Sequence, residues 1–432
     1  MLARGLGRAV LYLQTHDAAP HRDAILHACT HFVGYDAQAE AGRARYNFDL
    51  VEASGERDWY LPRLYHAFAT GEDVEDGEHL FELIGLLAQA GDAQSRALMY
   101  SVFADNAPKF DTRGAEELVD LDGLTGYVFV ARQWIAHPLP EDDQWDEDRL
   151  LDHAEKRFGA DAVTAALAAA QDEDAGKEAD LPAYLAQARE KRRLRNEQRP
   201  RRPHFPTPEY KTVRAIVDAP RGRATHYLLK RAGRNADDAL LLHLAHDLEA
   251  EADSARVLHL LYFFGWRPFP LPPHRLLALA QSDDQDTALA AQAALVHVAH
   301  PAVRALALAQ IAAGNLWHSV DMLTANSAEE DYALLAEITQ RPLPPGEFHD
   351  LGTSIRRYVE AYPLPLAIPA LLGLYENGLC AFCRHSVVET LLSLAPLPQA
   401  ILHELAWDAN EETRAFADPP PHALGDEAFP AG

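Results

Sequence analysis

The cluster in this sequence that most resembles a chemical site is a Cys-x-x-Cys pair, Cys380 and Cys383, with His385 two residues later. This spacing puts both sulfur atoms on one side of a turn, where they could bind zinc or take part in thiol–disulfide exchange. A structural zinc site needs four ligands, so a more distant histidine such as His403 would have to complete it. The alternative, which the sequence favours, is that both cysteines pack between helices as small apolar residues. No cofactor is therefore predicted.

The remaining histidines and the common catalytic motifs add no second site. Among the 21 histidines, a few pairs lie three or four residues apart, such as His243 and His246. Such pairs share a helix face, but random placement of 21 histidines produces them at a similar frequency. The sequence also contains no Gly-x-Ser-x-Gly motif, no Walker loop and no dinucleotide-binding fingerprint. No catalytic residue is predicted, and a non-enzymatic role is expected.

A basic run covers residues 189–202, with eight basic and two acidic residues, and includes Arg192, Arg193 and Arg195. Such a run could bind nucleic acid or an acidic partner. It could equally neutralise the acidic stretch 141–180 of the same chain. We favour the intramolecular role, and we keep these three arginines as candidate partner-binding residues.

Two further segments are candidate surfaces for binding a partner. One is the aromatic segment 262–269, and the other is an acidic loop expected to be exposed over residues 138–148. Aromatic residues and arginine dominate the energetics of protein interfaces, although core packing is the favoured interpretation of the aromatic segment. The candidate residues are Trp266, Arg267 and Phe269 in the first segment, and Asp142, Asp143, Trp145 and Asp146 in the second.

The elements that must position these residues are helices. In residues 80–87, for example, leucine and isoleucine fall at positions i, i+3, i+4 and i+7, which makes one apolar stripe on a helix. Residues 126–130 (Gly-Tyr-Val-Phe-Val) could form a strand, but they lead directly into another helical segment, so we predict one helix there. Strand-like alternation is otherwise almost absent, which predicts an all-α fold.

Helix ends are marked by glycine, proline and capping residues. Gly91, Gly233 and Gly314 each follow a periodic segment, as glycines at helix C-termini do. The segment Thr207-Pro208-Glu209 predicts a helix start, with Thr207 as N-cap and proline at the first helical position. The helices between such marks are short, about 10–16 residues each.

Three segments share a frame in which a cap-like residue is followed four positions later by Arg and then by Ala and a large apolar residue. They begin at Asp92, His300 and Asn410. Residues 300–314 in particular resemble the HEAT-repeat class of α-solenoids, whose helices often open with Asp or Pro and carry Val-Arg followed by Ala. The frames are irregularly spaced, so the resemblance implies a divergent stack of helical hairpins.

The predicted fold is therefore all-α, an α-solenoid of HEAT-like helical hairpins in two halves joined by a basic, Pro-rich hinge. Residues 1–188 form the N-terminal half, 189–206 the hinge and 207–418 the C-terminal half. Residues 419–432 form a disordered tail. The hinge is expected because prolines follow the basic run and cannot extend a helix.

Charge and cysteine content set the expected environment and partners. The chain has 39 Lys+Arg against 65 Asp+Glu, a formal net charge of −26, which argues against a general nucleic-acid binder. Three cysteines are too few for a disulfide framework, and no secretory signal or membrane span is recognisable, so a cytoplasmic location is expected. The strong preference for Arg over Lys, with abundant Ala, is typical of a GC-rich bacterial genome.

These observations predict a non-catalytic scaffold or regulator that binds another, basic protein through an acidic solenoid surface. A narrower hypothesis is an immunity or inhibitor protein that covers a basic toxin or nucleic-acid enzyme. One alternative is a metal-dependent or other enzyme on the same scaffold, centred on Cys380, Cys383 and His385. Another is a nucleic-acid-binding protein that uses the arginine-rich hinge.

Overall fold

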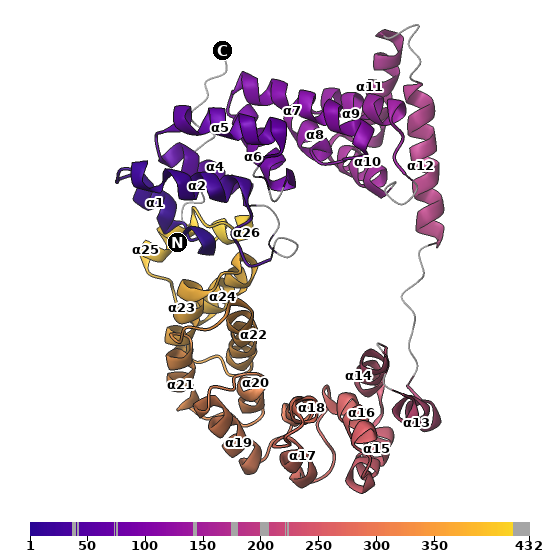
Figure 1. Ribbon diagram of the computed structural model, residues 1–432, viewed down its shortest axis with the longest axis vertical. Coiled ribbons are helices and arrows are strands. Elements are labelled where there is room, and N and C mark those ends of the chain that lie inside the picture. Colours follow the sequence, from indigo (N-terminus) through magenta and orange to yellow (C-terminus); the bar gives the residue numbers. More distant parts are fainter. Residues whose placement is uncertain are drawn as a thin grey trace. The chain divides into compact units, whose positions relative to one another are not determined.

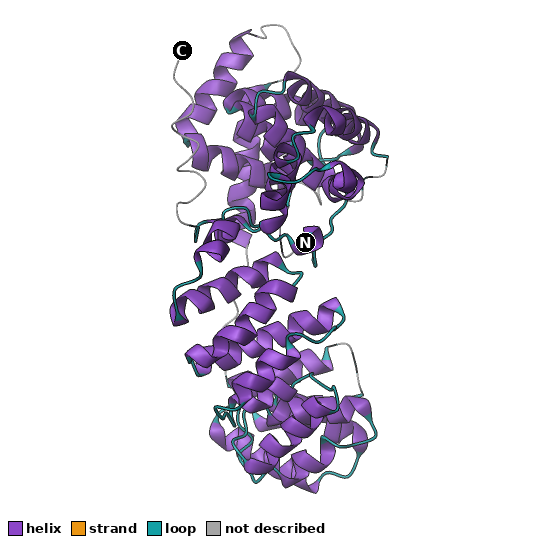
Figure 2. Cartoon of the chain, turned by 90° about the vertical axis from the view of Figure 1, so that its left-hand side faces the viewer, coloured by secondary structure: helices purple, strands orange, loops and turns teal. Residues whose placement is uncertain are grey.

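The computed structural model describes residues 1–36, 40, 43–72, 74, 77–140, 145–173, 180–198, 207–220, 222 and 224–417. Over these residues the protein is entirely helical, with loops and turns but no strand (Figure 2). The chain divides into two compact units. Unit 1 comprises Met1–Arg201 together with Pro398–Gly432, and unit 2 comprises Arg202–Leu397.

Unit 1 is built from helices of the N-terminal part of the chain and two short helices from its C-terminal end (Figure 1). Its core contains large side chains such as Tyr127 and Trp134, which come from the helix predicted at 126–135. The α-helices of unit 1 are α1 (Arg8–Leu13), α2 (Arg22–Thr30), α4 (Ala44–Ala53), α5 (Arg57–Thr70), α6 (Gly77–Gln89), α7 (Ala93–Asn106), α8 (Ala115–Asp122), α9 (Leu124–Ala136), α10 (Trp145–Phe158), α11 (Ala160–Glu173), α12 (Leu181–Gln198), α25 (Gln399–Leu405) and α26 (Glu411–Arg414). Three 3-10 turns accompany them, η1 (Leu2–Arg4), η2 (Ala19–His21) and η3 (Ala107–Lys109).

Unit 2 is a series of helices in which each even-numbered helix contacts the next even-numbered one, from α14 to α24. Phe263, Phe264 and Leu335 are among its fully buried core residues. The helices of unit 2 are α13 (Tyr210–Asp218), α14 (Thr225–Asn235), α15 (Asp238–Ala250), α16 (Ser254–Phe264), α17 (His274–Leu279), α18 (Gln285–Leu295), α19 (Pro301–Ala312), α20 (Ser319–Thr324), α21 (Asp331–Ile338), α22 (Pro345–Ala361), the 3-10 turn η5 (Pro365–Ala367), α23 (Ile368–Asn377) and α24 (Ala381–Leu394).

The C-terminal segment belongs to unit 1 and not to the predicted C-terminal half. Arg414 Nη1 lies 2.7 Å from Asp49 Oδ2, and both side chains are almost completely buried. Arg8 pairs with Glu404 at 2.9 Å. A Cβ on Gly7 would lie 2.0 Å from the Glu404 carbonyl oxygen, so only glycine permits this close approach. These contacts across the whole length of the chain could not be read from local patterns, which is why the predicted boundary differs.

The shared frame proves to be a helix N-terminus. Asp92, His300 and Asn410 are the N-caps of α7, α19 and α26, and each side chain accepts a backbone N–H of the first turn. The arginine four positions later forms an ion pair with another element, as in Arg304 with Asp331 at 2.7 Å and in Arg414 with Asp49. The frame therefore combines a capping residue with an inter-helix ion pair.

Two predicted helix ends are wrong. Gly233 lies inside α14, where a Cβ would be 1.8 Å from the Phe263 carbonyl oxygen, so this glycine allows α14 and α16 to pack closely. Helix α13 begins at Tyr210 with Glu209 as its N-cap, not at Thr207. Gly91 and Gly314 follow α6 and α19 with φ values of 93° and 87°, as the prediction requires.

The predicted hinge at 189–206 is helical over its first ten residues. Residues 189–198 continue α12, and residues 199–206 lie outside the described part of the chain. Repulsion among the arginines does not break the helix because carboxylates of α10 and of α12 itself pair with them. The disordered tail of the prediction, 419–432, also lies outside the described residues. None of the described helices has the length and apolar composition that crossing a membrane requires.

Candidate functional site

The Cys-x-x-Cys pair lies at the start of α24, where it is positioned by the helix N-terminus. Cys380 is the N-cap, and its Sγ accepts the backbone N–H of Cys383 at 3.3 Å. Arg384 follows the cap by four residues, so this segment matches the first half of the frame seen at Asp92, although with sulfur in place of oxygen. Cys380 is buried, with 5% of its surface exposed, and Cys383 is partly exposed.

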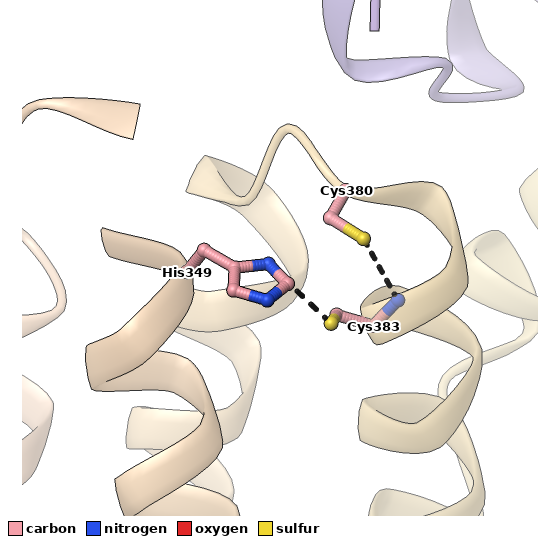
Figure 3. A group of neighbouring side chains, drawn as sticks. All are labelled: His349, Cys380 and Cys383. Carbon is pink, nitrogen blue, oxygen red and sulfur yellow. Dashed lines mark hydrogen bonds between the residues drawn. The ribbon is translucent and has the colours of Figure 1, made fainter. Parts of the chain in front are cut away.

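The third member of this cluster is His349, from the neighbouring helix α22. Its Nδ1 lies 3.6 Å from the Sγ of Cys383 (Figure 3). The ligand atoms of His349, Cys380 and Cys383 all lie within 4.8 Å of one another. Since α22 packs against α24 within unit 2, this proximity follows directly from helix packing.

His385, the histidine predicted from the sequence to join the cysteines, is not a member of this cluster. Its Nε2 faces Glu389 Oε1 at 3.7 Å, one turn further along α24. Sequence reasoning missed His349 because it is 34 residues from Cys383 and belongs to another helix. His403, the more distant candidate, lies on α25 in unit 1.

The arginines of the basic run are largely engaged within unit 1. Arg192 donates to Asp152 at 2.5 Å and to Glu155 at 2.7 Å, which are both on α10. Arg195 Nε donates to Asp148 Oδ2 at 2.6 Å. These pairs realise the intramolecular neutralisation that the sequence suggested.

Arg193 differs from its neighbours because it pairs only along its own helix. It donates to Glu190 at 2.7 Å and to Glu197 at 2.5 Å, and the three side chains are each more than half exposed.

The arginines of α12 that face α10 change the pKa of Glu155 on α10. Burial alone would raise the pKa of Glu155, but hydrogen bonds from Arg192 and Arg189 hold this pKa below its usual value.

The predicted acidic loop is described only in part. Asp142 and Asp143 lie outside the described residues. Trp145 is the first residue of α10 and is 56% exposed, with the Arg149 guanidinium 5.6 Å from its ring centre. Asp146 accepts a hydrogen bond from Thr112 Oγ1 at 2.8 Å, so it helps to fix the start of α10.

The aromatic segment divides into a surface residue and a core residue. Trp266 is 48% exposed, and the Arg234 guanidinium lies 5.4 Å from its ring centre. Phe269 is only 6% exposed and packs edge-on against Phe264 at 5.0 Å, so it has little surface to offer a partner.

Arg267 lies between these two residues and is tied to the start of α15. It donates to Asp238 Oδ1 at 2.7 Å and to the Ala236 carbonyl at 3.0 Å. Of the three candidates in this segment, Trp266 alone combines a large apolar ring with substantial exposure.

A surface groove that the sequence did not indicate runs along α21 in unit 2. Its volume is about 510 Å³. Small and apolar side chains form most of its lining, with Leu366 of η5 exposed to 48% on one side and two glutamates at the N-terminal end of α21. The lining residues are Glu329, Glu330, Tyr332, Ala333, Ala336, Leu366 and Pro369.

The apolar surface at the groove extends along the segment that leads into η5. Tyr362 and Leu364 are 39% and 44% exposed. Glu329 is exposed, and Glu330 is exposed while pairing with Arg304 at 3.1 Å. An apolar floor beside carboxylates suits a partner that carries both apolar and basic side chains.

Comparison with known proteins gives no family. No family model matches the chain, and no match was found among curated proteins or solved structures. The functional argument therefore rests on the geometry and charge of this chain alone.

Proposed function

We propose that this protein is a non-catalytic scaffold or regulator that binds a basic protein partner through the groove on α21 of unit 2. The observation that carries the proposal is the combination of an apolar groove floor, an exposed Leu366 and adjacent glutamates. Protein interfaces are typically built from an apolar centre with a polar rim. The sequence suggested an acidic binding surface, and the groove with its adjacent glutamates supports this suggestion.

The charge of the chain supports a basic partner. Even if every lysine and arginine were paired with a carboxylate of the same chain, 26 carboxylates would remain. Opposite charge on a partner would raise the association rate and favour it over acidic competitors. The binding would accordingly weaken as ionic strength rises.

The helix arrangement supports a repeat scaffold of the HEAT-like kind. Within unit 2, α14, α16, α18, α20, α22 and α24 make contact in succession, as helices do in stacked hairpins. Such stacks bind partners along extended surfaces and need no catalytic pocket. A narrower form of the proposal is an immunity or inhibitor protein whose partner is a basic toxin or nucleic-acid enzyme.

The test compares proteins captured from a cell lysate by immobilised full-length wild type and by Leu366→Arg. This substitution puts a cation on the groove edge and removes apolar surface, so we expect the affinity for the specific partner to fall about tenfold or more. The matched control is Leu242→Arg, because Leu242 is 43% exposed on α15 but is not part of the groove lining.

The proposal holds if the proteins retained by wild type and Leu242→Arg, and lost by Leu366→Arg, are basic and elute at higher salt. A further variant, Glu329→Lys, should reduce capture most strongly at low salt because it reverses a charge at the groove end. Capture of acidic proteins only, or equal capture by wild type and Leu366→Arg, would reject the groove as the binding site.

A further inference from the structure

The position of Cys380 in its helix calls for an explanation beyond capping. At the comparable N-caps of the described helices the acceptor is an oxygen or a ring nitrogen, whereas sulfur is a weak acceptor and caps poorly. A sulfur at this position is therefore better explained by a role that oxygen fills poorly, such as binding a soft or borderline metal ion as a thiolate. Other side-chain caps on the described helices include Asp92, Asp180, Asp237, Asp253, Asp284, His300 and Asn410.

The distances in the cluster match the ligand spacing of a tetrahedral zinc site. With Zn–S and Zn–N bonds of about 2.3 and 2.0 Å at a tetrahedral angle, a sulfur and a nitrogen ligand are about 3.5 Å apart, and two sulfurs about 3.8 Å. Cys383 Sγ and His349 Nδ1 are 3.6 Å apart. All three donor atoms already lie within 4.8 Å of one another, so small side-chain rotations suffice to surround an ion.

The donor set selects the kind of metal. Two thiolates and an imidazole are soft and borderline ligands, which bind Zn²⁺ and disfavour Mg²⁺ and Ca²⁺. We infer that unit 2 binds one zinc ion through His349, Cys380 and Cys383. Cys383 and His349 are partly exposed, so solvent reaches the site.

This site would join α22 to α24 by coordination in addition to packing. When zinc binds only to the folded state, the protein becomes more stable as the free zinc concentration rises above the dissociation constant.

The zinc site is independent of the groove along α21. Either can fail while the other holds, because they involve different residues and different assays.

The direct experiment measures zinc in full-length protein purified with a reductant and freed of weakly bound metal by gel filtration. We expect about one zinc per chain, resistant to a brief chelator wash. Replacement by Co²⁺ should give the intense visible bands of a tetrahedral site together with thiolate-to-metal charge-transfer absorption. Zinc below about one tenth per chain, with no such cobalt spectrum, would overturn the inference.

The variants separate this site from the one expected from the sequence. Cys380→Ser removes the sulfur but supplies a good N-cap, so the helix should form while zinc content falls at least about tenfold. Cys383→Ser and His349→Gln should lose zinc to the same extent. His385→Gln should keep it, because His385 faces Glu389 instead of the cluster.

Two other results would contradict the inference. One is a disulfide between Cys380 and Cys383 that forms in place of zinc binding under reducing conditions, which would make the pair a redox couple. The other is zinc retained by Cys380→Ser, which would place the ion on other ligands. A thermal unfolding series with and without zinc gives an independent readout, with a stabilising shift expected in wild type and absent in Cys380→Ser.

Discussion

The two units of this protein use their charged and reactive side chains differently. In unit 1, candidate partner-binding arginines are engaged within the unit, as when Arg192 pairs with Glu155 of α10. In unit 2 the groove beside Leu366 and the Cys380–Cys383–His349 cluster remain at or near the surface. A charge run in a sequence is thus a weak sign of binding when carboxylates lie within reach. Side chains that neighbouring helices bring together at the surface are a stronger sign of a binding site.

The largest expected effect concerns the buried ion pair that holds the C-terminal segment in unit 1. Arg414→Ala leaves the buried Asp49, which is 4% exposed, with only its second and longer ion pair to Arg45 at 3.2 Å, so we expect a loss of about 3 kcal/mol in unfolding free energy. Chemical denaturation measures this loss. Arg193→Ala is the control, because its solvent-exposed pairs should contribute little to stability. Similar effects of both variants would show that unit 1 does not depend on internal neutralisation.

The second prediction concerns a carboxyl group of unit 1 that lacks a compensating cation. Burial on α8 raises the pKa of Glu117 to about 7, with smaller contributions from the nearby acidic Glu78, Glu116 and Asp120. The folded state therefore favours the protonated acid, and stability falls as pH rises from the unfolded pKa of about 4.3 towards 7. Glu117→Gln should be more stable than wild type by about 2 kcal/mol at pH 8 and equal to it at pH 4. A pH-independent difference would contradict this assignment.

The third prediction examines the helix cap in unit 2. Cys380→Asp replaces a weak sulfur acceptor with a good N-cap, so the metal-free protein should gain about 1 kcal/mol in unfolding free energy. The same variant should lose any stabilisation by added zinc. Denaturation with and without zinc measures both quantities. If Asp destabilises the metal-free protein, the sulfur has a packing role that an oxygen cap cannot replace.

The smallest effect is the pH dependence of the pairs between α10 and α12. The pKa of Glu155 is lowered in the folded state, so its contribution to stability is present above the unfolded pKa of about 4.3 and is lost as pH falls through the folded value. Glu155→Gln should cost about 0.5 kcal/mol at pH 7 and progressively less below pH 4. An unchanged cost at low pH would mean that Glu155 acts through packing.

Sequence patterns predicted the features of this fold that depend on local chemistry. The helix at 126–135 and the capping roles of Asp92, His300 and Asn410 are confirmed, because they depend on neighbours within one helical turn. Gly233 was misassigned because its role, close packing against Phe263, involves a different helix.

The candidate site shows the same limit. The two cysteines could be found from their spacing, but His349 could not, since it is 34 residues from Cys383 and only the packing of α22 on α24 brings it near. The groove was missed for the same reason, because its lining combines α21 with Leu366 and Pro369, which belong to later elements of the chain. Side chains that come together only through the packing of distant helices produce no periodic pattern or fixed spacing in the sequence.

The central claim is that unit 2, and not the basic helix of unit 1, contacts the partner. Hydrogen–deuterium exchange of the full-length protein, alone and with the captured basic partner, tests it directly. We predict slower exchange on binding at residues 329–338 and 364–369 and unchanged exchange along α12. Protection of α12 with no change around the groove would contradict the claim and favour binding through the arginine-rich run.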